Sequence, residues 1–165
     1  MKLYLIRHGD AVPETQDPSR PLSKEGVLNI SEITAFLEIA GVKVEEIWHS
    51  TKLRAKQTAE LIASGIPHKK VIEREGIAPN DPVQAIADEM NVLGRDIMLV
   101  GHLPFLEKLV SHLMTGRDHY NPVIFDRGEV VCMEKDGEKF SIIWMINPRL
   151  LNSCIQGNSK LQPRS

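Results

Sequence analysis

Short apolar runs alternate along the chain with longer segments in which apolar residues recur every three or four positions. The runs predict β-strands, and the periodic segments predict amphipathic helices. The predicted strands are 2–6, 44–49, 70–73 and 96–100, and helices are predicted over 24–40, 51–64, 81–93 and 104–115. This alternation is typical of a parallel sheet that is covered by helices on both faces.

Polar residues and glycines mark the ends of these helices. Ser23 is the expected N-cap of the first helix, because a serine hydroxyl can accept a hydrogen bond from the first turn. Ser50 or Thr51 offers a similar cap for the second helix. Gly41 and Gly116 stand just beyond predicted helices, where a C-terminal glycine is favoured.

The pattern changes near the end of the chain, where apolar residues occur at every second position. Segments 129–134 and 139–146 flank Asp136-Gly137, which is a strong signal for a β-hairpin. From Asn147 onward the sequence is polar and has no periodicity, so we expect the end of the chain to fray.

These elements predict a three-layer α/β/α sandwich with a mostly parallel sheet and an antiparallel C-terminal hairpin. We expect one domain over residues 1–148 and a polar tail over residues 149–165. A chain of 165 residues is long enough to bury a sizeable core without disulfides.

Charge and composition exclude several classes of function. The formal net charge of −2 argues against a general binder of nucleic acids or membranes, which needs a broad basic face. No apolar run approaches the ~20 residues that span a bilayer, and the start of the chain lacks the apolar core of a signal peptide. Cys132 and Cys154 are interpreted as reduced thiols. We therefore expect a cytoplasmic monomer whose anion site, if present, is local.

Residues suited to chemistry follow three of the predicted parallel strands. The first strand runs into Arg7-His8-Gly9, the second into Ser50 with Arg54 one helical turn later, and the fourth into His102. Ligands of open parallel sheets bind outside the carboxyl ends of the strands. We therefore expect these side chains to meet at one edge of the sheet.

Arginines and neutral imidazoles together suit a phosphoryl group. Arg54 could belong to a solvated helix surface and Arg20 to an ordinary loop, but two or three guanidinium groups around one site match a phosphoryl dianion. Nearby arginines disfavour protonation of His8 and His102, so at least one of the two rings is expected to be neutral at neutral pH, and a neutral imidazole is a nucleophile. The other histidines are expected on the surface or in packing roles: His49, His68, His112 and His119.

Motifs of competing chemistries are missing from the sequence. A glycine-rich loop followed by Lys-Ser or Lys-Thr is absent, which argues against nucleoside triphosphate binding. Histidines at metal-ligand spacing with a carboxylate are absent, and so is Gly-X-Ser-X-Gly. We expect neither a cofactor nor a metal.

Three motifs together resemble the histidine phosphatase superfamily, which has the phosphoglycerate mutase-like fold. They are Arg7-His8-Gly9, the segment 50–58 with its Leu-Arg-Ala and Gln-Thr, and Gly101-His102. The segments 7–11, 19–26 and 101–104 are most similar to the small bacterial SixA branch of phosphohistidine phosphatases. The resemblance covers roughly residues 1–148.

The resemblance implies that His8 forms a covalent phosphohistidine and that water then attacks this intermediate. It also implies that Arg7, Arg54 and Arg20 hold the phosphoryl oxygens, while His102 donates a hydrogen bond to the transferred group. No metal is required. Larger relatives protonate the leaving oxygen with a glutamate. The positional candidate for this proton donor is Glu75, and the alternatives are Glu14 and Asp17.

The nature of the leaving group favours a phosphoprotein substrate. Imidazole, with a pKa of about 6.5, leaves without the strong acid that an alkoxide requires. The short connections also leave little sequence for a lid over the site. A histidine phosphotransfer domain or a phosphocarrier protein is the partner that the resemblance suggests. The alternatives are a small-molecule phosphomonoesterase or mutase with Glu75 as its acid, a non-catalytic phosphate-binding module, and an unrelated α/β protein with chance motifs.

Overall fold

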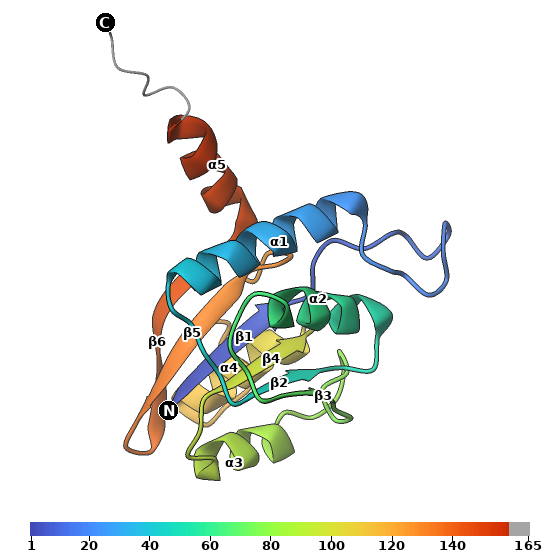
Figure 1. Ribbon diagram of the computed structural model, residues 1–165. Helices are drawn as coiled ribbons and strands as arrows, with labels where there is room; N and C mark the ends of the chain where they lie inside the picture. The colour runs from blue at the N-terminus through green and yellow to red at the C-terminus, as the bar shows by residue number, and fades with distance from the viewer. Residues whose placement is uncertain (159–165) are drawn as a thin grey trace, which may run out of the picture.

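The structure is a computed structural model that describes residues 1–158 (Figure 1). Strands and helices alternate up to the fourth helix, and a hairpin and one more helix follow. In chain order the elements are β1 (Lys2–Arg7), α1 (Lys24–Ile39), β2 (Glu46–His49), α2 (Leu53–Ala63), β3 (Lys70–Glu73), α3 (Gln84–Val92), β4 (Ile97–Gly101), α4 (Phe105–Thr115), β5 (Val130–Asp136), β6 (Lys139–Ile146) and α5 (Pro148–Asn158).

The strands of the described residues form one sheet with the order β3-β2-β4-β1-β5-β6. β1, β2, β3 and β4 are parallel, whereas β5 runs antiparallel to both β1 and β6. This arrangement confirms the predicted α/β class with a parallel core and an antiparallel C-terminal hairpin. β1 lies between β4 and β5 in the interior of the sheet. Its carboxyl end therefore has a neighbouring strand on each side.

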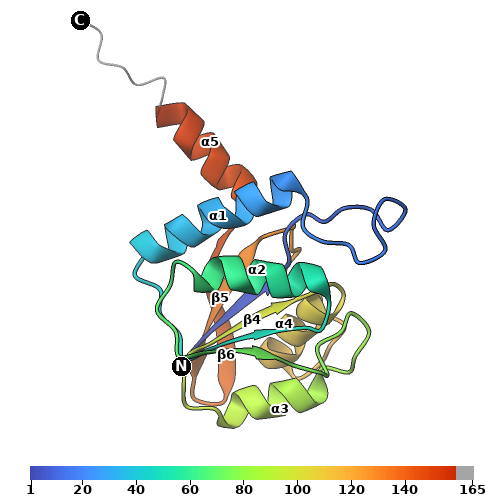
Figure 2. The same cartoon turned by 45° about the vertical axis from the view of Figure 1, so that its right-hand side comes forward.

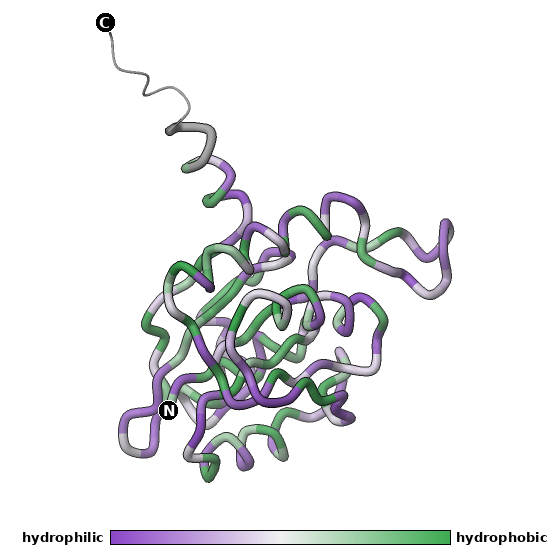
Figure 3. Tube along the Cα trace, viewed as in Figure 1, coloured by the Kyte–Doolittle hydropathy of each residue, from purple (hydrophilic) through white to green (hydrophobic). Residues whose placement is uncertain are grey.

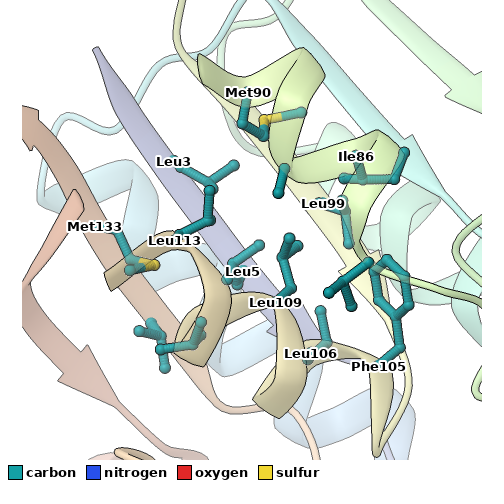
Figure 4. Close-up of a cluster of buried hydrophobic side chains, with 14 of the residues drawn as sticks. Leu3, Leu5, Ile86, Met90, Leu99, Phe105, Leu106, Leu109, Leu113 and Met133 are labelled. Carbon is teal, nitrogen blue, oxygen red and sulfur yellow. The ribbon is translucent and has the colours of Figure 1, made fainter. Parts of the chain in front are cut away.

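Two hydrophobic clusters fill the space between the sheet and its helices. Figure 2 shows α1 and α2 on one side of the strands and α3 on the other. Under α1 and α2 the cluster includes Ile6, Ile33 and Ile47. On the opposite face, side chains of α3 and α4 pack on β1 and β4 around Leu5 and Leu99 (Figure 4). β4 is buried throughout, as its continuous apolar run predicts.

The ends of the hairpin and of α1 follow the predicted local signals. The Ser23 hydroxyl accepts a hydrogen bond from the backbone N–H of Gly26 at 3.0 Å and caps α1. Gly137, at a φ of 61°, forms the turn between β5 and β6, which Figure 3 shows as a hydrophilic stretch. These two features fix where the polypeptide enters α1 and where it reverses after β5.

Two predicted helix starts were wrong. α2 begins after Lys52 without a side-chain cap, because the hydroxyl of Ser50 is bonded to the ring of His102. α3 begins at Gln84, because the Asp81 carboxylate instead accepts a 2.7 Å hydrogen bond from the backbone N–H of Ala78 and closes a turn before the helix. In both cases a polar side chain that could cap a helix is used elsewhere.

The expectation of a fraying tail was wrong for its first part, which forms α5. Asn147 caps this helix by accepting a 2.9 Å hydrogen bond from the backbone N–H of Leu150, and Pro148 occupies the first helical position. Leu151 packs against the cluster under α1. Residues 159–165 of the predicted tail lie outside the described residues.

Within residues 1–158, no helix combines the length and the apolar character that crossing a membrane demands.

Candidate active site

His8 lies directly after β1 with its side chain only 8% exposed. Its Nδ1 lies 2.7 Å from the carbonyl oxygen of Gly9. A carbonyl can only accept, so Nδ1 carries the proton, and Nε2 presents its lone pair. Nε2 in turn accepts a 3.2 Å hydrogen bond from Nε of Arg54. The ring is therefore oriented with a nucleophilic nitrogen toward the guanidinium of Arg54.

Side chains of α2 fix the loop that follows His8 and the first turn of α2 relative to each other. The hydroxyl of Thr58 accepts a 3.1 Å hydrogen bond from the backbone N–H of Gly9 and donates a 2.7 Å bond to the carbonyl of Arg54. Gln57 accepts a 2.7 Å bond from the backbone N–H of Leu22, which fixes the segment before α1. The Gln-Thr pair of the motif thus connects α2 to both loops that surround His8.

Arg7 is the last residue of β1, and the loop before β5 fixes its side chain. One terminal nitrogen of its guanidinium donates a 2.8 Å hydrogen bond to the carbonyl of Phe125. Its Nε is buried and lacks a hydrogen-bond partner among the described residues. Burial, with a smaller contribution from the charge of Arg127, lowers the pKa of Arg7. A buried donor without a partner is costly, and an anionic oxygen would satisfy it.

His102 follows β4 and is 2% exposed. Its Nε2 is hydrogen-bonded to the hydroxyl of Ser50, which follows β2. Its Nδ1 is buried and, like Nε of Arg7, has no partner within the described part of the chain. Both of these buried side-chain atoms belong to residues that the sequence assigned to a phosphate site.

The two imidazoles face each other and are held neutral. Their ring centroids are 5.0 Å apart, and the rings are tilted by 54°. Burial lowers the pKa of His8 to about 4, with further lowering from Arg54, Arg7 and Arg127. Burial also lowers the pKa of His102 to about 3, with the charges of His8 and Arg54 next. Neutrality was predicted from the arginines alone, but burial is the larger cause.

Arg20 approaches the site from the loop before α1. It adopts a φ of 50°, which is unusual for a residue with a side chain. Its Nε donates a 3.4 Å hydrogen bond to the carbonyl of Val12, and its charge lowers the pKa of Arg54 after the larger effect of burial. The charge of Arg20 therefore acts on Arg54, although its hydrogen bond is to its own loop.

The sequence did not point to Arg127, which stands in the loop before β5. Its guanidinium forms an ion pair with the Asp10 carboxylate. Asp10 also accepts a 2.6 Å hydrogen bond from the hydroxyl of Ser23. Burial raises the pKa of Asp10, but the bonds from Ser23 and Arg127 outweigh it and lower the pKa overall. Asp10 is therefore held ionised beside His8.

The sequence candidates for a proton donor lie apart from these contacts. Glu75 follows β3, the edge strand, and is exposed, without a hydrogen bond or ion pair to a site residue in residues 1–158. Glu14 is likewise exposed, and the Asp17 carboxylate accepts hydrogen bonds from Ser19 in its own loop. Their catalytic roles remain predictions.

Within the described residues, none of the other histidines forms a hydrogen bond to Arg7, His8, Arg54 or His102. His49 is buried and its Nδ1 donates to the carbonyl of Ser50 at 2.9 Å, His68 donates to Ile66, and His119 is exposed beside Tyr120. The part of the chain that the structure describes contains no group of three or more His, Cys, Asp or Glu side chains arranged to hold a metal ion.

The arrangement can bind and attack a phosphoryl group. Arg54 contacts the Nε2 atom of His8, the ring of His102 lies 5.0 Å away, and Arg7 adds a third basic group, whose charge acts on His8, while both rings remain neutral. Such preorganised donors stabilise the charge on a transferred phosphoryl group. The structure thus brings together the four residues that the sequence selected from three different strand ends.

Comparisons with known proteins agree with this geometry. The model of the Histidine phosphatase superfamily (branch 1) matches residues 3–78. An uncharacterized protein of Picosynechococcus sp. is 31% identical over 126 residues, which cover 71% of this chain and 75% of that protein. Phosphohistidine phosphatase SixA of Escherichia coli is 25% identical over 157 residues, which cover 90% and 94%. A structure of the protein histidine phosphatase SixA complexed with tungstate has a TM-score of 0.83 at 24% identity, covering 92% of this chain and 99% of that one.

Proposed function

Because this chain belongs to branch 1 of the histidine phosphatase superfamily, we propose that it removes the phosphoryl group from phosphohistidine in a phosphoprotein. The proposed partner is a histidine phosphotransfer domain or a phosphocarrier protein. The reaction passes through a phosphoryl group covalently bound to His8.

The orientation of His8 carries the proposal. Its proton is on Nδ1, its Nε2 faces Arg54, and its pKa of about 4 keeps the ring neutral at physiological pH. A neutral imidazole with a fixed lone pair needs no base to remove a proton before it attacks. The Arg54 N–H that occupies this lone pair can turn to a phosphoryl oxygen when substrate binds.

Two displacements account for the reaction. In the first, Nε2 of His8 attacks phosphorus, the bond from phosphorus to the substrate imidazole breaks, and that imidazole takes a proton from solvent. In the second, water attacks the phosphorus of phospho-His8 and loses a proton. This step releases inorganic phosphate and restores the lone pair of Nε2. Arg7, Arg54 and His102 bind the oxygens in both steps.

The state of the nearby carboxylates favours phosphohistidine over a phosphate ester. Asp10 is held ionised by Ser23 and Arg127, so it is poorly suited to donate a proton. Glu75 is exposed after the edge strand β3. An alkoxide leaving group needs an acid, whereas an imidazole leaves readily near neutral pH.

The proposal is tested by offering three phosphorylated substrates in the presence of a chelator: a protein phosphorylated on histidine, a phosphoserine peptide and a sugar phosphate. We expect the histidine-phosphorylated protein to be hydrolysed fastest, with a rate that chelation does not change. Faster hydrolysis of the sugar phosphate would instead indicate a small-molecule phosphomonoesterase. A loss of activity with the chelator would contradict the metal-independent mechanism.

Rapid acid-free quenching with radiolabelled substrate tests the intermediate. We expect acid-labile label on the wild-type protein and none on His8→Ala. His119→Ala is the matched control, because His119 is exposed and outside the site, and it should be labelled like the wild type. Equal labelling of His8→Ala and wild type would exclude His8 as the nucleophile.

A further inference from the structure

The loop of residues 125–129 is fixed against the residues that follow β1. The backbone N–H of Gly128 lies within hydrogen-bond distance of the carbonyls of Arg7, at 3.0 Å, and His8, at 3.3 Å. The backbone N–H of Arg7 donates to the carbonyl of Glu129 at 3.2 Å, and its guanidinium donates to Phe125. A residue on this loop therefore has a defined position relative to the His8 ring.

A buried carboxylate shapes the same loop. Glu129 is 5% exposed, and its side chain accepts a 2.7 Å hydrogen bond from the backbone N–H of Asp126. Burial raises the pKa of Glu129. A buried carboxyl group is unfavourable without such a partner. The bond between Glu129 and the Asp126 N–H therefore favours this one conformation of the loop. Arg127 stands in this loop and pairs with Asp10, two residues after His8.

Arg127 uses part of its guanidinium to bind Asp10 and is otherwise half exposed. A guanidinium carries five N–H groups in a planar fork with more than one bonding edge. Asp10 is itself anchored by the hydroxyl of Ser23 at the start of α1. A fixed backbone and an anchored carboxylate together reduce the freedom that the long side chain would lose on binding a ligand.

The positive charge of Arg127 influences two residues of the candidate site. It lowers the pKa of both His8 and Arg7 after the larger effect of burial. Arg149, another exposed arginine nearby, pairs with Asp126 and acts on Glu129 instead. Both arginines line one surface pocket, but the charge of Arg127 acts on the pKa of His8, whereas that of Arg149 acts on the pKa of Glu129.

We propose that Arg127 binds the transferred phosphoryl group through a second edge of its guanidinium, and that Asp10 is the positioning residue that holds it there. The charge of Arg20 acts on Arg54 in α2, whereas Arg127 acts on His8 from the loop before β5. In phosphoryl transfer, negative charge spreads over three equatorial oxygens, so a further cationic donor stabilises the transferred group. This inference rests on the proposed function, since it assumes that His8 receives a phosphoryl group.

Orthovanadate, which adopts the five-coordinate geometry of phosphoryl transfer, is the probe for this contact. We expect Arg127→Ala to weaken vanadate binding, measured by calorimetry, at least about tenfold, as for loss of a hydrogen bond to a charged group. Arg127→Lys should recover part of the affinity. Arg149→Ala is the matched control and should bind vanadate like the wild type.

Arg127 could matter merely because it neutralises Asp10 beside the anion. The double variant Arg127→Ala with Asp10→Asn separates the two roles. If Arg127 contacts the vanadate, the double variant binds as weakly as Arg127→Ala. Recovery of wild-type affinity in the double variant would overturn the inference, as would unchanged binding in Arg127→Ala. Failure of the wild type to bind vanadate would overturn the proposed function and this inference with it.

Discussion

Nε of Arg54 donates a 3.2 Å hydrogen bond to Nε2 of His8, although the two residues are 46 positions apart in the chain. The bond joins the first turn of α2 to the end of β1, and the Thr58 hydroxyl supports it by linking Gly9 to the Arg54 carbonyl. It keeps the lone pair of His8 directed at the place where a phosphoryl group would bind. Arg54 therefore orients the nucleophile and supplies charge to the same point.

Replacing Arg54 by lysine tests this double role. Arg54→Lys keeps a positive charge but removes the planar fork, so we expect kcat/KM for a histidine-phosphorylated protein to fall by about a hundred- to a thousandfold. Steady-state kinetics measure the loss. Lys56→Ala, at an exposed position of the same helix, should retain wild-type kinetics. A fall of less than about threefold in Arg54→Lys would show that a point charge is sufficient.

The low pKa values of the two imidazoles predict how stability depends on pH. His8 and His102 are neutral in the folded protein down to about pH 4 and 3, whereas both are protonated below about 6.5 in the unfolded chain. The unfolded state therefore binds more protons between these values, and the free energy of unfolding decreases as the pH falls from about 6.5 toward 4.

Urea denaturation at several pH values checks this dependence. The loss of stability between pH 7 and 5 should be smaller in His8→Ala than in the wild type, because one of the two groups is removed. Nitrogen chemical shifts of the imidazole rings offer an independent measurement, and at pH 5.5 they should show both rings in the neutral form. Protonation of His8 at that pH would contradict the assignment of a resting nucleophile.

The sequence predicted the site wherever a parallel strand leads into a helix. Arg7, His8, Ser50, Arg54 and His102 all follow carboxyl ends of parallel strands, and these ends share one edge of the sheet. Their grouping also depends on the order of the strands, which the alternation of apolar runs does not specify. The bonds that orient each ring, however, depend on side-chain packing between residues distant in the chain.

Arg127 was missed for a topological reason. β5 runs antiparallel to β1. The beginning of β5, rather than its end, therefore lies beside the carboxyl end of β1, where His8 stands. The rule that ligands bind at the carboxyl ends of parallel strands does not cover the start of an antiparallel strand. Glu75 was chosen as the positional counterpart of the glutamate in larger relatives, and its role stays a prediction. It does follow a parallel strand, but β3 is at the outer edge of the sheet, two strands beyond β4.

Helix α5 was not predicted, because the sequence after Asn147 has no hydrophobic periodicity. The signal that it does contain is a helix cap. Asn147-Pro148 is a favourable N-cap and first-turn pair, and it precedes Leu150 and Leu151. One of these leucines, Leu151, packs against the cluster under α1. A helix whose contact with the core is made by the partly buried Leu151 leaves little periodic signal, so local capping chemistry is the stronger sequence evidence.

The hydrogen bond between Ser50 and His102 predicts a positioning role for Ser50. For His102 to donate from Nδ1 to a phosphoryl oxygen, the serine hydroxyl must donate to Nε2 and so fix the ring tautomer. Ser50→Ala should therefore lower kcat by about ten- to a hundredfold with a smaller change in KM, as expected when a catalytic group is misaligned.

Two further variants separate this role from an effect on folding. Ser50→Thr retains a hydroxyl and should recover part of kcat, whereas Thr51→Ala, at the exposed next position, should leave kcat unchanged. Equal kcat in Ser50→Ala and wild type would mean that the His102 tautomer is set without Ser50. A loss in Ser50→Ala that Ser50→Thr does not recover would point to packing at this buried position.

Gly26 determines how closely α1 can approach the catalytic loop. A Cβ atom at this position would lie 2.1 Å from the backbone carbonyl oxygen of Asp10, and backbone atoms cannot move aside as a side-chain end can. Helix propensity alone would favour alanine over glycine by about 1 kcal/mol. Overpacking against a fixed group costs about 1–3 kcal/mol, and here the loop that follows His8 must also move. We therefore expect Gly26→Ala to reduce both the stability of the protein and its phosphatase activity.

Gly94→Ala provides the matched comparison for this substitution. Gly94 has a backbone conformation that any residue can adopt, and no atom lies within 4 Å of the place that a Cβ would take. Alanine there should therefore change the free energy of unfolding by less than about 0.5 kcal/mol. Thermal or urea denaturation measures stability, and kcat reports whether the loop that follows His8 has moved.

If Gly26→Ala matched Gly94→Ala in both quantities, α1 would not be in contact with the backbone of Asp10. Because Ser23 and Asp10 are bonded across the same junction, that result would also remove the anchor inferred for Arg127.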